Sequence, residues 1–205
     1  DLVVGGTDTT SNTVAWAMTE LLKNPEVMRK AQQEIELVVG RDQHVEESHL
    51  TKLPYLGAVI KEVLRLHPTL PLLVPHSPSS PSKVAGFDIP VGTRVMINVW
   101  AIHRDPKYWD HPSVFDPDRF LRKPDLDFSG RDFHYFPFGS GRRICVGITL
   151  AERMIFLILA SLLHSFDWHV VGGEKIDTTE KFGIVLKQAN PLSAIPSPRS
   201  HCREL

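Results

Sequence analysis

The sequence has little of several features that would mark a specialised class of protein. Its two cysteines give no disulfide framework, which suits a reducing compartment. The formal net charge is −1, so there is no basic excess to attract nucleic acid. The most apolar run, residues 154–163, is about half of the ~20 residues needed to span a bilayer. We therefore expect no transmembrane helix or signal peptide, and a buried core helix over that run.

The overall composition is that of a folded domain. The chain has 205 residues, of which 42% are hydrophobic and 23% charged, enough for one domain with a sizeable core. We expect residues 1–205 to form a single, partial domain. The sequence begins without Met, inside a segment predicted to be helical, and this favours a fragment of a longer protein.

One stretch concentrates the chemistry: Phe138-Gly139-Ser140-Gly141-Arg142-Arg143-Ile144-Cys145-Val146-Gly147. Its glycines permit close backbone approaches, so N–H groups of the loop can point at the Cys145 sulfur. An apolar helix is predicted over 146–164, and its first N–H groups and dipole favour a negative charge. With two arginines adjacent, these features favour a thiolate. We interpret Cys145 as an anionic ligand or a nucleophile, rather than the inert buried residue that a lone cysteine usually is.

The N-terminal 22 residues predict a helix with an interruption at residues 5–11. A glycine pair and a run of hydroxyl residues are poor choices for a helix interior. Two interpretations remain open from the residues alone. Either Asp8 or Thr9 caps a helix that begins there, or the helix opens locally and presents Asp8 and Thr9 to a ligand.

Two further helices are predicted over 25–39 and 54–66, because each has proline at its first position and a breaker at its end. A short helical turn is expected within 41–52. On the second helix, Glu62 and Arg65 are three residues apart and face the same way. Their apolar neighbours indicate burial, where both charges would need further partners.

The rest of the chain predicts short strands and long irregular connections. Residues 110–137 are expected to be irregular but ordered by their aromatic residues, and the tail from Asn190 is expected to be loose. The predicted fold class is mainly α with small β-sheets. The strands are predicted over 83–87, 94–100, 166–171 and 182–188.

Four motifs occur in the order in which cytochromes P-450, the haem-thiolate monooxygenases, carry them. They are Gly5-Gly6-Thr7-Asp8-Thr9-Thr10, Glu62-x-x-Arg65, Pro117-Asp118-Arg119-Phe120 and Phe138-x-x-Gly141-x-Arg143-x-Cys145-x-Gly147. The chain resembles the C-terminal part of a family member, which is well over twice as long. The resemblance implies the C-terminal, haem-binding portion of the P-450 fold, without the N-terminal half.

The resemblance also implies a cofactor and its contacts. Cys145 would be the axial thiolate ligand of haem b, iron protoporphyrin IX. Arg143 would pair with a haem propionate, and His76 matches a position that reaches a propionate in some relatives. The remaining positions of the cofactor loop are Phe138, Gly141 and Gly147.

Other residues receive roles from the same resemblance. Asp8 and Thr9 match the acid–alcohol pair that relays protons to bound dioxygen. The structural ion-pair triad of the family corresponds to Glu62, Arg65 and Arg119. Substrate contacts are implied for Val4, Gly5 and the apolar segments 70–74 and 182–185.

The implied activity is insertion of one oxygen atom into a small hydrophobic plant metabolite. The finer sequence is similar to flavonoid 3′-hydroxylase-like and terpenoid hydroxylase-like members. Electrons would come from NADPH through NADPH–cytochrome P-450 reductase, and the parent protein would be anchored in the endoplasmic reticulum membrane on its cytosolic face. The alternative is a truncated, catalytically inactive fragment that binds haem or a partner.

A third class, a cysteine hydrolase or a dinucleotide-binding protein, is disfavoured. Ile144 stands where G-x-G-x-x-G needs its last glycine. Covalent catalysis by Cys145 would need a histidine base, and His134 and His164 lack any local signature for that role.

Overall fold

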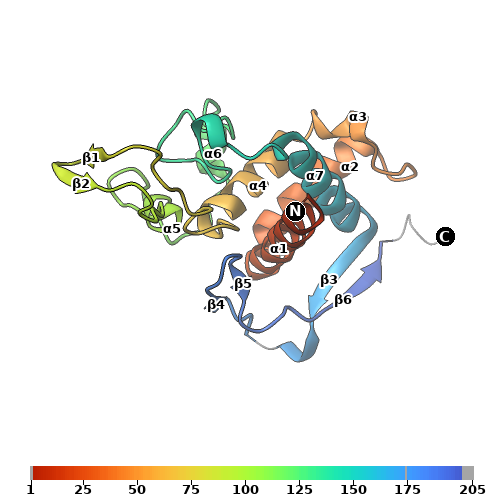
Figure 1. Ribbon diagram of the computed structural model, residues 1–205. Coiled ribbons are helices and arrows are strands. Elements are labelled where there is room, and N and C mark those ends of the chain that lie inside the picture. Colours follow the sequence, from red (N-terminus) through yellow and green to blue (C-terminus); the bar gives the residue numbers. More distant parts are fainter. Residues whose placement is uncertain (1, 174, 200–205) are drawn as a thin grey trace.

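The computed structural model describes residues 2–173 and 175–199, and these residues form helices with three small sheets (Figure 1). Cys202 lies outside the described residues. The prediction of a mainly α fold with small β-sheets is confirmed. In chain order the elements are α1 Leu2–Lys23, α2 Pro25–Val39, α3 Glu47–Leu50, α4 Pro54–Leu66, β1 Ser82–Val84, β2 Phe87–Ile89, α5 Val99–Ile102, α6 Asp118–Arg122, η1 Gly141–Arg143, α7 Ile148–Ser165, β3 Phe166–Val170, η2 Val171–Gly173, β4 Glu180–Lys181, β5 Lys187–Gln188 and β6 Ala194–Pro198.

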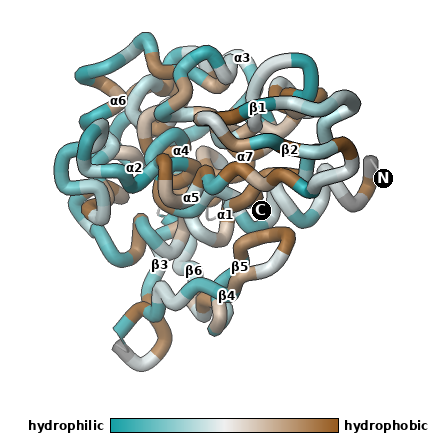
Figure 2. The backbone as a smooth tube through the Cα atoms, turned by 60° about the vertical axis from the view of Figure 1, so that its left-hand side comes forward, coloured by the Kyte–Doolittle hydropathy of each residue, from teal (hydrophilic) through white to brown (hydrophobic). Residues whose placement is uncertain are grey.

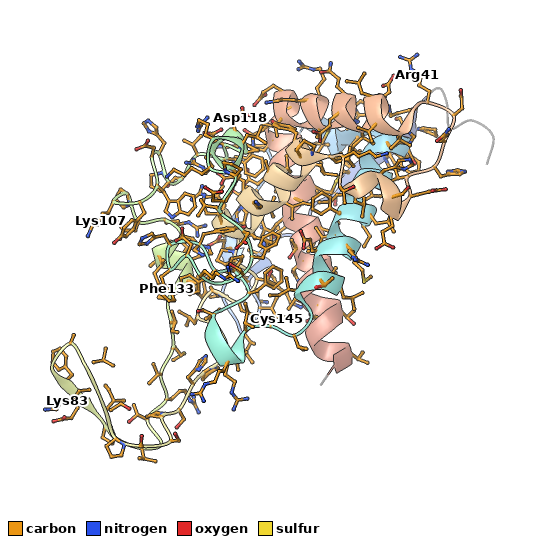
Figure 3. The ribbon with its side chains drawn as sticks, turned by 90° about the horizontal axis from the view of Figure 1, so that it is seen from above. Arg41, Lys83, Lys107, Asp118, Phe133 and Cys145 are labelled. Carbon is orange, nitrogen blue, oxygen red and sulfur yellow. The ribbon has the colours of Figure 1, made fainter. Side chains whose placement is uncertain are left out.

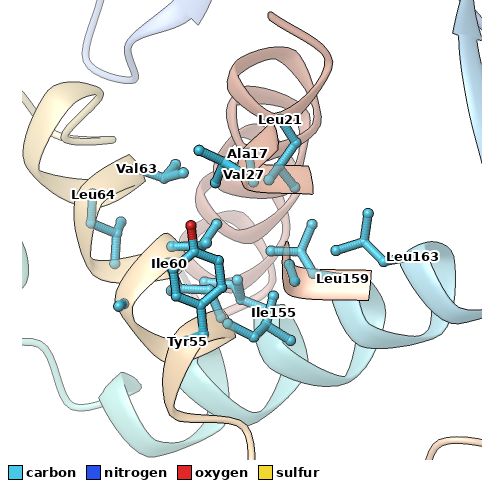
Figure 4. Close-up of a cluster of buried hydrophobic side chains, with 14 of the residues drawn as sticks. Ala17, Leu21, Val27, Tyr55, Ile60, Val63, Leu64, Ile155, Leu159 and Leu163 are labelled. Atoms are coloured by element: carbon cyan, nitrogen blue, oxygen red, sulfur yellow. The ribbon is translucent and has the colours of Figure 1, made fainter. Parts of the chain in front are cut away.

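The core lies where α1, α2, α4 and α7 meet (Figure 4). Helix α4 supplies Leu56, Val59, Ile60 and Val63, which recur at helical spacing and are almost fully buried. Burying one such side chain contributes about 1.5–3 kcal/mol. The predicted bounds of α2 and α4 and the short helix α3 are confirmed.

Helix α1 runs unbroken through the segment that was expected to interrupt it. The Thr7 hydroxyl donates to Val3 O (2.7 Å), and the Thr9 hydroxyl donates to Gly5 O (2.6 Å). These hydroxyls donate to carbonyls one turn back, so they coexist with the backbone hydrogen bonds of the helix and do not replace them. The predicted interruption is therefore wrong, because the helix neither opens at residues 5–11 nor begins at Asp8.

Helix α7 buries only one of its faces. Ile155, Leu159 and Leu163 point into the core, whereas Leu150 on the other face is 64% exposed. By length and composition this 18-residue helix is apolar enough to cross a membrane, a test that core helices of soluble proteins also pass. The predicted helix over 146–164 is confirmed, whereas the prediction that the run 154–163 is buried was wrong for its outer face, where Met154 and Leu157 are exposed.

The sheets differ from the predicted strands in two places. The predicted strand 83–87 is a hairpin, since Ala85 (φ 48°) and Gly86 (φ 86°) form a two-residue turn between β1 and β2. The predicted strand 94–100 is reduced to one bridge, between His76 and Val95. The chain then enters α5, where Asn98 Oδ1 accepts a hydrogen bond from the Ala101 N–H (3.0 Å).

The C-terminal strands depend on pairing between distant segments. Within the predicted strand 182–188, only Lys187–Gln188 form a strand, β5, and residues 182–186 form the turn between β4 and β5, a hydrophobic segment in Figure 2. The tail expected to be loose contains β6, which pairs antiparallel with β3. The irregular stretch 110–137 also contains helix α6.

Candidate functional site

The cysteine loop, residues 138–147, is built from backbone turns. Gly139 (φ 78°) and Gly141 (φ 67°) adopt the left-handed region that side chains with a Cβ disfavour. The Cys145 N–H donates to Phe138 O (3.0 Å), which closes the loop. Helix α7 begins three residues after Cys145, with Gly147 at its N-cap.

The Cys145 side chain is exposed beside an apolar surface. Val146 is 93% exposed, and Leu150 lies one turn further along the chain. Figure 3 shows Cys145 on the helical body, away from the hairpin that carries Lys83. Among the hydrogen bonds of the described residues, no N–H donates to the Cys145 sulfur, so that detail of the predicted loop was wrong. The nearest glycine, Gly147, would place a Cβ 3.8 Å from Sγ.

Gly130 packs directly against the backbone of the cysteine loop, a role that sequence reasoning missed. It has φ 69°, and a Cβ built on it would lie 2.4 Å from Gly139 O and 3.0 Å from Ser140 Cα. Both contacts are with backbone, which cannot rotate away. The chain at Gly130 and the cysteine loop therefore touch at a distance that only glycine permits.

An aromatic cluster supports the same loop. The Phe138 ring meets Phe128 edge to face at 5.2 Å, and Phe128 lies 6.1 Å from Tyr135. Tyr135 is fully buried, its hydroxyl donates to Lys61 O (2.9 Å), and burial raises the pKa of its phenol well above 10.0. The loop thus rests on rigid, apolar groups.

Glu62, Arg65 and Arg119 form one buried ion-paired cluster. Arg65 donates from Nε to Glu62 Oε2 (2.7 Å) and from Nη2 to Oε1 (2.8 Å), a bidentate pair. Arg119 Nε donates to Glu62 Oε1 (3.1 Å), and Arg65 Nη1 also donates to Pro112 O (2.8 Å). Every charge is therefore paired and further hydrogen-bonded, as burial requires. The cluster joins α4 to α6 and the chain before it.

His103 links this cluster to the cysteine loop and was also missed. It is fully buried, its carbonyl accepts from Arg65 Nη1 (2.8 Å), and its Nε2 accepts from the Phe136 N–H (3.1 Å). Burial, together with the positive charges of Arg65 and Arg104, lowers the pKa of His103 to about 3. The ring is therefore neutral at physiological pH and serves as an acceptor.

Asp8 and Thr9 are adjacent on α1 but have different hydrogen-bond partners. The Asp8 carboxylate is exposed and accepts from Lys187 Nζ of β5 at 3.1 Å. Thr9 is partly buried, and its hydroxyl donates to Gly5 O. Lys187 follows Asp8 by 179 residues, so no local pattern could have revealed this ion pair.

The residues expected to face the propionates are accessible. Arg142 and Arg143 are exposed in η1, and neither guanidinium forms an ion pair within the described part of the chain. His76 is exposed and is positioned by backbone hydrogen bonds with Val95 (2.8 Å in each direction).

The two apolar segments expected to contact substrate lie against other parts of the site. In segment 70–74, Leu73 has φ 52°, and its Cδ1 would lie 3.8 Å from a Cβ at Gly139. In segment 182–185, Ile184 is 84% exposed, and the Phe182 ring packs edge-on against Trp100 at 6.4 Å. The Val4 side chain lies outside what the structure describes, whereas Gly5 is exposed on α1.

No histidine is placed as a base for Cys145 among the described residues. His134 stacks on Tyr108, with ring centroids 3.5 Å apart. His164 Nε2 lies 2.8 Å from Gly40 O at the far end of α7. At 1.5 Å per residue, this is roughly 25 Å from the cysteine. The hydrolase interpretation therefore has no support in the geometry.

Comparison with known proteins gives consistent matches. The family model described as cytochrome P-450 matches residues 1–194. Cytochrome P-450 76C1 of Arabidopsis thaliana is 53% identical over 199 residues, which are 96% of this chain and 39% of that protein. Geraniol 8-hydroxylase of Catharanthus roseus is 50% identical over 200 residues (96% and 40%). Flavonoid 3′-monooxygenase of Petunia hybrida is 47% identical over 205 residues (97% and 40%).

A solved structure of zebra fish cytochrome P-450 with abiraterone matches with a TM-score of 0.86 at 36% identity. The match covers 96% of this chain and 45% of that one. The chain thus spans about two fifths of the length of the curated relatives that it matches.

Proposed function

The chain belongs to the cytochrome P-450 family, and from this membership we propose that the protein it forms part of is a haem-thiolate monooxygenase. It would insert one oxygen atom from dioxygen into a small hydrophobic molecule, using NADPH-derived electrons from a reductase. Residues 1–205 would be the C-terminal, haem-binding part of that protein. The observation that carries the proposal is the exposed Cys145 on its glycine-built loop.

The residues around Cys145 fit a flat, largely apolar iron porphyrin. The sulfur is accessible, and the side chains exposed beside it, Val146 and Leu150, are apolar. Glycines at 141 and 147 leave room for a planar ring close to the backbone. When bound, haem supplies the binding and activation of dioxygen, with the thiolate as electron donor.

The chain's own residues would hold the group in place. Cys145 would ligate the iron, and Phe138 would pack beside the loop. Arg143 would pair with a propionate, since its guanidinium is exposed and has no ion-pair partner among the described residues. His76 would offer a second contact of this kind from the strand bridge with Val95.

Asp8 and Thr9 would move protons at named atoms. The Thr9 hydroxyl donates to Gly5 O, so its oxygen is free to accept a hydrogen bond from a water molecule. Asp8 is at the surface and paired with Lys187, so its carboxylate can exchange protons with solvent. Together they would carry a proton from the surface toward the face of α1 that bears Gly5.

The substrate would be a small hydrophobic plant metabolite, a terpenoid or a flavonoid. Two observations support this proposal. The segments 70–74 and 182–185 are apolar, and similar proteins include a geraniol 8-hydroxylase and a flavonoid 3′-monooxygenase. We further propose NADPH–cytochrome P-450 reductase as the electron donor and the cytosolic face of the endoplasmic reticulum membrane as the location.

The test is the absorbance spectrum of the reduced, carbon monoxide-treated full-length protein. We expect the red-shifted Soret band of thiolate ligation in the wild type and its loss in Cys145→Ser. The matched control is Cys202→Ser, the same change at the other cysteine, which should keep the band. A wild-type protein that binds haem without that band would contradict the proposal.

A second candidate applies to residues 1–205 alone: a catalytically inactive fragment that binds haem or a partner. Large exposed apolar side chains, among them Val146 and Ile184, favour it, because they suit contact with further protein. Purified residues 1–205 should then give no turnover of geraniol with reductase and NADPH. Turnover by this segment would overturn the second candidate and leave the first standing.

A further inference from the structure

His67 is a buried histidine that none of the proposed steps uses. It directly follows α4, and its N–H donates to Val63 O (2.7 Å). Its ring stacks face to face on Trp16 of α1, with centroids 3.9 Å apart and planes 4° apart. Because the stack fixes the plane of the ring, it also fixes the directions in which both ring nitrogens point.

Each ring nitrogen faces a carboxylate. Nε2 lies 2.9 Å from Glu20 Oε1 on α1, and Nδ1 lies 3.1 Å from Glu180 Oε1 on β4. An ionised carboxylate only accepts hydrogen bonds, and a neutral imidazole carries a single N–H. Only the doubly protonated ring can therefore donate to both. As an imidazolium, His67 joins α1 to β4, which lie side by side in Figure 1.

On the β4 side, the other groups keep Glu180 ionised. Arg104 Nη2 lies 3.2 Å from Glu180 Oε1, and Trp100 Nε1 donates to Oε2 (2.8 Å). Burial by itself raises the pKa of Glu180. The hydrogen bond from His67 and the charge of Arg104 outweigh it, so the pKa falls below its ordinary value of 4.5.

On the α1 side, Glu20 has weaker partners than His67. Lys23 Nζ is 3.9 Å from Glu20 Oε1 and half exposed, so solvent screens its charge. Asn24 Nδ2 donates to Glu20 Oε2 (3.3 Å) but carries no charge. The buried Glu20 carboxylate therefore depends on the imidazolium. The C-terminal carbonyls of α4 also favour a cation at this position.

The chain just after His67 also contacts the far end of the turn between β4 and β5. The Leu186 N–H donates to Thr69 O (2.9 Å), and Leu186 is fully buried. Residues 67–69 thus contact the β4–β5 segment at two points, Glu180 and Leu186. The side chains between these two anchors, Phe182 and Ile184, remain exposed.

We propose that His67 is a positioning residue whose protonated ring clamps β4 to α1 and holds the 182–185 turn in place as a wall of the substrate site. The role given to the turn rests on the proposed function, whereas the clamp rests on the geometry alone. Without an N–H at both ring nitrogens, one of the two carboxylates loses its hydrogen bond and the clamp loosens. A loosened turn then binds an apolar substrate more weakly.

The test is hydrogen–deuterium exchange of the 180–188 segment in the full-length, haem-loaded protein, compared between the wild type and variants of the clamp at one pH. We expect protection of the Leu186 amide to fall by about tenfold in a variant without the two donors of His67, the loss of one charge-assisted hydrogen bond. Equilibrium dialysis with geraniol should show weaker binding by the same variant.

Two variants separate the clamp from simple packing. His67→Phe keeps a ring to stack on Trp16 but removes both donors, and Glu180→Gln removes the acceptor charge on the turn. Both should show lower protection of the Leu186 amide than the wild type. The matched control is Lys181→Gln, which changes one charge on the next residue of β4 and should behave as wild type.

The outcomes distinguish this inference from the proposed function. A His67→Phe or Glu180→Gln variant that is as well protected as the wild type would overturn the clamp. A protein that lacks the thiolate Soret band but shows the expected exchange would overturn the monooxygenase and keep the clamp. The exchange measurement needs no turnover.

Discussion

Two buried histidines near the C-terminal end of α4 lie in opposite electrostatic surroundings. His103 sits among arginines and accepts a hydrogen bond from the Phe136 N–H, two residues before the cysteine loop, so it is neutral. His67 sits between the carboxylates of Glu20 and Glu180. The first region supports the cysteine loop with an acceptor and several arginines. The second holds the 182–185 turn through contacts between the ring of His67 and two carboxylates.

The difference shows how one helix supports a rigid part and an adjustable part. The cysteine loop rests on the Glu62–Arg65–Arg119 cluster, whose arginines stay charged at any physiological pH. The turn rests on His67 and on the Leu186 N–H, and its side chains Phe182 and Ile184 are exposed. Rigid placement suits a metal ligand, and adjustable placement suits a substrate wall.

The largest effect should come from breaking the rigid region. Glu62→Gln leaves Arg65 and Arg119 buried without their counter-charge, so we expect about 3–5 kcal/mol less free energy of unfolding. The matched control is Glu47→Gln, whose partner Arg153 is 2.7 Å away with both side chains over 60% exposed. It should cost less than ~1 kcal/mol. Urea unfolding measures both, and equal losses would contradict the importance given to burial.

A smaller loss in the free energy of unfolding is expected from a substitution at Gly130, which packs against the cysteine loop. Gly130→Ala combines positive-φ strain of about 1–2 kcal/mol with a clash against Gly139 O that costs about 1–3 kcal/mol more. Gly92→Ala has the strain alone, because φ is 82° and no atom lies within 4 Å. Urea unfolding should show the larger loss for Gly130→Ala, and only this variant should shift the Soret band. Identical behaviour would show that the loop tolerates displacement.

Acidification should lower the free energy of unfolding through His103, which lies in the rigid region. Its folded pKa of about 3 lies below the ordinary 6.5, so between these values the unfolded chain binds one more proton. Stability should therefore fall as the pH drops below 6.5, by about 1.4 kcal/mol per pH unit at most. Urea unfolding at pH 7 and pH 5 measures the slope, which His103→Gln should reduce.

The smallest effect is expected on the surface of the adjustable region. Lys187→Gln removes the half-exposed ion pair with Asp8 and should change the free energy of unfolding by less than ~1 kcal/mol. Glu180→Gln, on the partner strand β4, removes buried contacts and should cost more. Thermal unfolding of the two variants compares them directly. A larger loss from Lys187→Gln would contradict the view that the hairpin is held from its buried side.

Much of the site could be predicted from local sequence. The cysteine loop and the helices that begin at Pro25 and Pro54 are encoded by neighbouring residues, so their patterns could be recognised directly. The pairing of Glu62 with Arg65 follows from their spacing on one helix. The prediction failed at α1, because hydroxyl groups that bond one turn back look the same in a sequence as those that break a helix.

Tertiary structure decided what depends on partners far along the chain. His67 meets Glu20 and Glu180 across 47 and 113 residues, so these partners could not follow from its neighbours in sequence. Gly130 is a glycine of no evident purpose until the cysteine loop folds onto it. Sequence alone determined the family, because its motifs are local. The fold decided which groups surround each histidine, because burial and charge pairing exist only once distant segments meet.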